Sequence, residues 1–272
     1  MRFEKNRRDH YLPRGYLRGF IDPSRKNHQR PLWHYDIPNG VWSERSPREV
    51  GFRIGFYDFA TAESGLEHAD TTFGELERTF PALRQELISN NFRNWKDHRD
   101  FLLRYIQMIR ARGLLFFDQK HAEGRALQTW VIEEISPDRR IIKVRSIVPE
   151  PPSEAFIRNR ALAEMRAEIK KGAAGLNDFN WALRLCESVA DPFIISEIPF
   201  MAFGPSATSE EAMRHPETLL FFPLCWQACI IGSRQFFDDE TGVLGQEDMQ
   251  RARKMYREKA SLFVLSPTKL DF

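Results

Sequence analysis

The amino-acid sequence predicts an α+β fold. Apolar residues recur at helical spacing through the middle of the chain, whereas β-branched and aromatic residues gather near residues 127–148 and after Pro192. The helical segments lie between strand-like segments and do not alternate regularly with them. We therefore expect a central helical bundle with short antiparallel strands and hairpins near the N-terminus, in mid-chain and near the C-terminus.

The first predicted helix lies in the segment HYLPRGYLRGF, which begins at His10. Pro13 suits the first turn of a helix, because the N–H that proline lacks would have no partner there. Helical spacing places four apolar residues on one face of this helix: Leu12, Tyr16, Leu17 and Phe20.

Two segments predict β-hairpins. In PLWHYDIPNGVWSE, aromatic residues alternate with polar ones before the pair Asn39-Gly40, a strong turn signal. In residues 127–148, two stretches rich in β-branched residues flank the turn sequence SPD. We expect one domain over residues 1–272, with the hairpin at 127–148 as a possible insertion.

Several longer segments predict helices. Phe73 to Leu87 carries an apolar stripe that Thr71 or Thr72 could cap, and a helix from Asp97 should continue past Gly113. Ser153 should open another helix, which ends near Gly172. We also expect a helix from Asp178 through Trp181, Leu185 and Val189, and a charged helix over about 246–260. The remaining apolar segments after Pro192 predict strands.

The net charge of the chain is small and unevenly distributed. The net charge is +2, far below that of a strongly basic nucleic-acid-binding protein, but residues 1–30 carry nine cations against three acids. Residues 92–113 carry six cations against two acids, so an anionic partner could be steered to these regions.

The sequence also predicts where the protein is found. It has no apolar leader, no segment long enough to span a membrane and no even set of cysteines. We therefore expect a cytoplasmic protein without a membrane partner.

The opening segment resembles the signature of a bacterial family known as a domain of unknown function, DUF4238. The matching residues are His10, Tyr11, Leu12, Pro13, Tyr16, Leu17 and Phe20. Further likeness comes from the strand LWHYD, acidic residues Glu75 and Glu77, the pair Gln107 and Arg110, and Pro223-Leu224. Where the family has Ser-Asp-x-Pro, this chain has Ser196-Glu197-Ile198-Pro199. The resemblance implies a shared fold and supplies no activity.

Polar residues from these distant segments form the candidate site. His10 could act as a general base or acid, a glutamate could orient it, and arginine could hold a phosphate through two hydrogen bonds. The candidate catalytic residues are His10, Glu77, Gln107, Arg110 and Glu197. The candidate anion-binding residues are Arg14, Arg110 and Arg112. Alternatively, the same residues tie the first helix to the core, with Arg110 paired to Glu77.

Other chemistries lack their sequence signals. The histidines and the three cysteines do not have zinc-ligand spacing, and the chain has no P-loop, no G-x-G-x-x-G and no G-x-S-x-G. We therefore predict neither a metal nor a cofactor. Three hypotheses stay open: a module that binds phosphate or nucleic acid, a nuclease- or phosphodiesterase-like hydrolase that uses a His/Glu/Arg site including His10, and an interaction protein with a structural polar network. The oligomeric state is not predicted.

Overall fold

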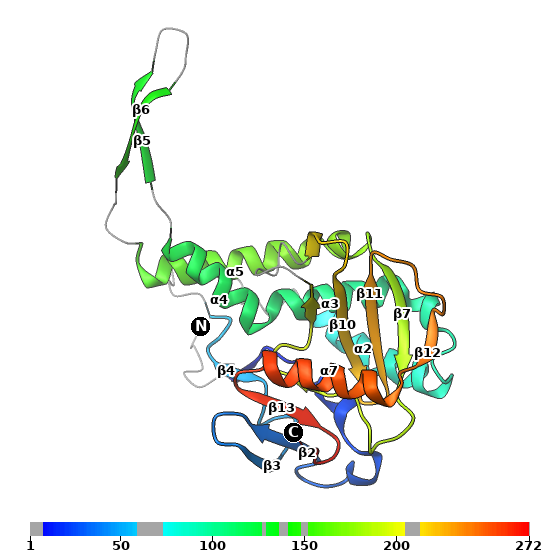
Figure 1. Ribbon diagram of the computed structural model, residues 1–272. Coiled ribbons are helices and arrows are strands. Elements are labelled where there is room, and N and C mark those ends of the chain that lie inside the picture. The colour runs from blue at the N-terminus through cyan, green and yellow to red at the C-terminus, as the bar shows by residue number, and fades with distance from the viewer. Residues whose placement is uncertain are drawn as a thin grey trace.

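The computed structural model describes residues 8–58, 73–126, 129–135, 141–147, 152–204 and 213–271. In these residues, helices pack against a five-stranded sheet, and a four-stranded sheet lies below it (Figure 1). Helices and small sheets follow one another without a regular βαβ alternation, so the α+β class is confirmed. None of the described helices has the length and apolar character that crossing a membrane requires. The three cysteines are free thiols.

The larger sheet has the strand order β12-β7-β11-β10-β9. Its strands are β7 (Asn180–Leu185), β9 (Met201–Phe203), β10 (Leu219–Cys225), β11 (Ala228–Ser233) and β12 (Thr241–Val243). All neighbours are antiparallel except β12 and β7, which run parallel at one edge. The strands expected after Pro192 therefore form most of this sheet.

Helices cover both faces of the sheet because β10 and β11 are apolar on both faces. Phe222 and Ile230 belong to the main hydrophobic cluster, whereas Phe221 and Ile231 belong to a second cluster. The second cluster includes residues of α7 (Gln246–Lys259), which crosses one face, while α2 (Gly74–Ser89) and α3 (Arg99–Arg112) lie behind the other (Figure 1). The helices are layered on a sheet, and the expected central bundle is not confirmed.

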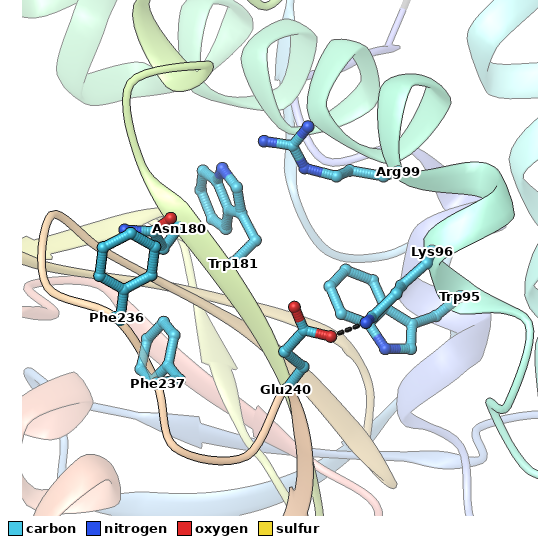
Figure 2. A pocket seen from close by; sticks show the side chains of 8 residues that line it. All are labelled: Trp95, Lys96, Arg99, Asn180, Trp181, Phe236, Phe237 and Glu240. Carbon is cyan, nitrogen blue, oxygen red and sulfur yellow. Dashed lines mark ion pairs between the residues drawn. The ribbon is translucent and has the colours of Figure 1, made fainter.

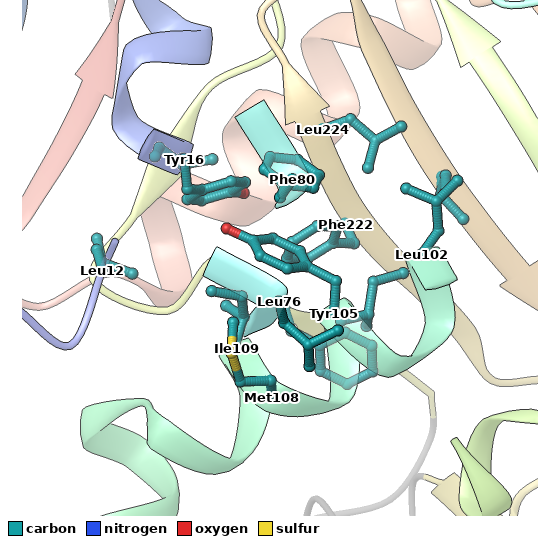
Figure 3. Packing of buried hydrophobic residues seen from close by; sticks show 14 of the residues in the cluster. Leu12, Tyr16, Leu76, Phe80, Leu102, Tyr105, Met108, Ile109, Phe222 and Leu224 are labelled. Carbon is teal, nitrogen blue, oxygen red and sulfur yellow. The ribbon is translucent and has the colours of Figure 1, made fainter. Parts of the chain in front are cut away.

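The opening segment is embedded in the main core. It forms α1 (Arg14–Leu17) followed by the 3-10 turn η1 (Arg18–Phe20), and Tyr16, Leu17 and Phe20 are fully buried. The Tyr16 ring stacks on Phe222 with 5.3 Å between ring centroids. Figure 3 shows Tyr16 among side chains of α2, α3 and β10. Its hydroxyl donates to the carbonyl oxygen of Pro223 at 2.6 Å, so the first helix is fixed to β10.

The middle helices agree with the sequence except at one point. The apolar stripe of α2 is buried as expected, although Thr71 and Thr72 lie outside the described residues. The helix from Asp97 is interrupted at Gly113, whose extended backbone (φ −69°, ψ 158°) separates α3 from α4 (Leu114–Arg125). In α5 (Glu154–Lys170), the Ser153 hydroxyl accepts the Phe156 N–H at 3.2 Å, which confirms the predicted start.

Both expected hairpins are present. β2 (Leu32–Asp36) and β3 (Val41–Arg45) pair across Asn39-Gly40, where Gly40 adopts φ +66°. They join β8 (Ile195–Ser196) and β13 (Phe263–Ser266) in the order β3-β2-β13-β8. The second hairpin, β5 (Thr129–Ile135) and β6 (Ile141–Ile147), projects beyond α4 and α5 (Figure 1). The remaining elements are β1 (Arg8–His10), β4 (Phe52–Ile54), η2 (Pro23–Arg25), η5 (Trp95–His98) and η6 (Ala174–Leu176).

The helix expected from Asp178 is wrong, because residues 180–185 form strand β7. Trp181 and Leu183, two positions apart, both face the main core, as strand alternation requires. β7 pairs along its whole length with β11, from Asn180 opposite Ser233 to Leu185 opposite Ala228. These long-range hydrogen bonds outweigh the local helical spacing of Trp181 and Leu185.

Candidate functional site

Arg112 lies at the centre of a buried polar network between β1, α2 and α3. Its side chain is only 2% exposed, and its guanidinium forms an ion pair with Glu77. The same group donates to the main-chain oxygen of His10, and its Nε donates to the Tyr57 hydroxyl at 3.0 Å. It also lies over the Phe73 ring, 4.5 Å from the centroid. Arg112 is therefore paired on several sides by the protein's own groups.

His10 takes part in this network through its main chain. Its ring packs beside Phe52, with 5.6 Å between centroids. Burial lowers the pKa of the imidazole, and the nearby cations Arg14 and Arg112 lower it further, so the ring is neutral at pH 7. Its Nε2 is buried and has no hydrogen-bond partner in the described part of the chain. Arg14 itself is exposed on α1.

Gln107 and Arg110 meet a different acid, Glu168 of α5. Arg110 donates to Glu168 Oε1 at 2.5 Å, and Gln107 Nε2 donates to the same oxygen at 2.9 Å. Gln107 Oε1 accepts from Arg110 Nε at 3.1 Å, and Lys171 donates to Glu168 Oε2 at 2.9 Å. This group joins α3 to α5. Glu77, the alternative partner considered for Arg110, pairs with Arg112 instead.

Glu197 is an anchor for the turn between α7 and β13. Its carboxylate is 2% exposed and accepts the backbone N–H groups of Ser261, Leu262 and Phe263 at 2.5, 3.0 and 3.2 Å. The Ser261 hydroxyl donates to it as well, at 3.0 Å. The candidate residues are thus distributed over three networks, around Arg112, Glu168 and Glu197.

The structure has a pocket that none of these residues lines. Its volume is about 310 Å³, and it lies where η5 and the start of α3 face β7 and the loop between β11 and β12 (Figure 2). We call it the aromatic pocket. Its lining residues are Trp95, Lys96, Arg99, Asn180, Trp181, Phe236, Phe237 and Glu240.

Two tryptophans form the buried wall of the aromatic pocket. Trp181 Nε1 donates to the Leu176 oxygen at 2.9 Å, and Trp95 Nε1 donates to the Thr241 hydroxyl at 2.9 Å. Gly232 lies opposite Trp181 on β11, where an added Cβ would lie 2.8 Å from the indole ring. Because both ring N–H groups are already bonded, the tryptophans offer the pocket only carbon surface.

The rim of the pocket is a loop, residues 234–240, that the sheet holds at both ends. Asn180 Nδ2 donates to the oxygens of Arg234 and Gln235 at 3.3 and 3.4 Å, and Arg184 donates to the Asp239 oxygen at 3.0 Å. Between these anchors, the Phe236 side chain is 89% exposed. The protein therefore presents an apolar ring to solvent from a backbone fixed by hydrogen bonds.

The charged residues of the pocket are unequally paired. Lys96 forms an ion pair with Glu240, and both side chains are more than half exposed. Arg99 points toward Trp181 in Figure 2. Its guanidinium has no hydrogen-bond or ion-pair partner in the part of the chain that the structure describes. Two cations and one acid leave this pocket with a positive charge.

A second pocket, of about 460 Å³, lies at the end of α2. It is lined by Ser89, Asn90, Asn91, Arg93, Asn94 and Asp97. Asn91 and Phe92 adopt left-handed backbone conformations there, with φ of 48° and 59°. This pocket has no aromatic lining residue, so it offers less contact to a ligand than the aromatic pocket.

Comparison with known proteins places the chain in a family. A family model described as a protein of unknown function, DUF4238, matches residues 8–250, which is most of the chain. This protein belongs to the DUF4238 family. No curated protein and no solved structure matches it.

Sequence reasoning missed the aromatic pocket of this DUF4238 protein. The one signal that pointed toward it was the excess of cations in residues 92–113, which include Lys96 and Arg99. Local spacing places Trp181 on a helix, and the loop with Phe236 carries no motif. The pocket depends on the pairing of β7 with β11 and β12, which local patterns do not specify.

Proposed function

We propose that this DUF4238 protein is an anion-binding module whose aromatic pocket holds phosphate or a phosphate-bearing molecule. The observation that carries the proposal is the Arg99 guanidinium, which lines the pocket without an acidic partner among the described residues. Guanidinium is planar and matches phosphate with two parallel hydrogen bonds. A phosphate bound there would offset the positive charge of the pocket.

Lys96 supports the same proposal. Its ion pair with Glu240 joins two side chains that are 55% and 56% exposed, and such surface pairs are worth at most about 1 kcal/mol. An incoming phosphate can therefore compete with Glu240 for the ammonium group. The site would then use two cations from neighbouring positions, one on η5 and one on α3.

The candidate residues His10, Glu77 and Arg112 have no part in the anion site proposed here. The bonds from Arg112 to Glu77 and to the His10 main chain favour a structural role for the network beneath α1. The hydrolase alternative needs a substrate within reach of His10, and the aromatic pocket does not include His10. Hydrolysis at His10 therefore stays a prediction from the sequence.

The proposal is tested by titrating the full chain with inorganic phosphate and with pyrophosphate in a calorimeter, at low and high salt. We expect binding that weakens with salt and that falls about tenfold or more in Arg99→Gln, because a charged hydrogen bond is lost. Arg104→Gln is the matched control, since Arg104 is exposed on the same helix and does not line the pocket. Equal affinity of Arg99→Gln and the unaltered protein would contradict the proposal.

A further inference from the structure

We infer that the anion is the phosphate of a mononucleotide, whose base stacks on Phe236 while Arg99 holds the phosphate. This inference rests on the proposed anion site and names its ligand class. It follows from three properties of the aromatic pocket: the exposed ring on its rim, its size, and the hydrogen-bond acceptors that flank it.

Phe236 has the most exposed large apolar side chain among the described residues. Water contact with this ring is unfavourable, and the loop that carries it is fixed at Asn180 and Arg184. These bonds hold the main chain on both sides of the ring. Its neighbour Phe237 is half-buried, with Arg184 5.3 Å from its ring centroid, so Phe236 is the more exposed of the two rings. A planar base would cover the exposed face.

The volume of the pocket limits the length of the ligand. About 310 Å³ lies at the lower end of the range for small-molecule sites. A single nucleotide fits this scale, whereas a strand of several nucleotides needs a continuous groove. Because Trp95 and Trp181 present carbon surface, the wall suits the sugar and the edge of a base better than a hydrated ion alone.

Two lining residues of the pocket, Asn180 and Glu240, carry hydrogen-bond acceptors. Asn180 uses its Nδ2 on the rim loop, so its Oδ1 is left without a hydrogen-bond partner among the described residues. One carboxylate oxygen of Glu240, Oε2, contacts Lys96, and Oε1 has no described partner. Ribose hydroxyls and the amino group of a base are donors that match these acceptors. Inorganic phosphate has neither the ribose hydroxyls nor the amino group of a base.

The test compares adenosine monophosphate, adenosine and inorganic phosphate, each titrated into the full chain by calorimetry, with tryptophan fluorescence as a second signal. We expect adenosine monophosphate to bind about tenfold or more tightly than phosphate or adenosine. Phe236→Ala should remove the advantage of the nucleotide over phosphate and leave phosphate affinity unchanged. Phe156→Ala, at an exposed phenylalanine of α5 that does not line the pocket, is the matched control.

The outcomes separate this inference from the proposed function. Phosphate that binds as tightly as the nucleotide, with both dependent on Arg99, would overturn the nucleotide inference and leave the anion site intact. Adenosine that binds as tightly as the nucleotide, with no effect of Arg99→Gln, would overturn both. A nucleotide preference that survives Phe236→Ala would also overturn the stacking proposed here.

Discussion

The Arg112 guanidinium donates to the main-chain oxygen of His10, not to its imidazole. The first residue of the opening segment HYLPRGYLRGF is therefore held by its main-chain oxygen, a group that every amino acid has. Its side chain contributes packing against Phe52 and a neutral ring beside two arginines. Different substitutions should separate the contribution of the side chain from that of the main chain.

Replacing Arg112 should be far more costly than replacing His10. Arg112→Ala leaves Glu77 and the His10 oxygen without their cation, which should lower the free energy of unfolding by about 3 kcal/mol or more. His10→Ala removes only part of the ring packing, for which we expect about 1 kcal/mol. Urea denaturation measures both, and Arg104→Ala should lie within about 0.5 kcal/mol of the unaltered protein. A larger loss in His10→Ala than in Arg112→Ala would refute this assignment.

Glu197 should be essential to the junction of α7 and β13. Glu197→Ala leaves three backbone N–H groups without their acceptor, which should cost about 3 kcal/mol. Glu197→Gln keeps one acceptor oxygen and should cost less. Thermal and urea denaturation of both variants should be compared with Glu187→Ala, at an exposed glutamate of the preceding loop. A neutral Glu197→Ala would show that these contacts do not stabilise the fold.

Stability should fall as the pH drops from 7 to 5. Burial lowers the pKa of both His10 and His34 below the usual value of 6.5, so the unfolded chain binds protons more readily than the folded one. The associated stability is fully present above pH 6.5 and is lost as the pH falls toward the folded pKa values. Urea midpoints at pH 7, 6 and 5 measure the effect, and His10→Gln should reduce the slope. Urea midpoints that do not change between pH 7 and pH 5 would contradict the expected loss of stability.

Gly15 and Gly74 should respond oppositely to alanine. A Cβ at Gly15 would lie 2.8 Å from Pro81 Cγ, so Gly15→Ala should destabilise the packing of α1 on α2 by about 1–3 kcal/mol. Among the described residues, no atom beyond the chain neighbours and the backbone of the helix itself lies within 4 Å of a Cβ at Gly74, the first residue of α2. Gly74→Ala should therefore stabilise by up to about 1 kcal/mol. Differential scanning calorimetry of the two variants measures their melting temperatures. Shifts of the same sign in both variants would contradict the prediction.

Local sequence signals were sufficient to predict several elements. The turn at Asn39-Gly40, the cap at Ser153 and the apolar stripe of α2 each depend on neighbours within about one turn, and each is found as expected. Residues 180–185 differ, because their spacing fits a helix and their long-range partners in β11 make a strand. The break between α3 and α4 at Gly113 likewise cannot be predicted locally, because the apolar pattern continues on both sides of it.

Composition and local periodicity are enough to predict the α+β class, the buried face of the opening segment and the surplus of cations in residues 92–113. Long-range packing places the candidate polar residues in separate networks, around Arg112, Glu168 and Glu197, and brings Arg99 and Phe236 into one pocket. The pocket joins Arg99 and Phe236, which are 137 residues apart in the sequence, and it exists only after β7 pairs with β11 and β12. Side-chain partners at that separation are selected by packing of the whole chain, which local spacing does not encode.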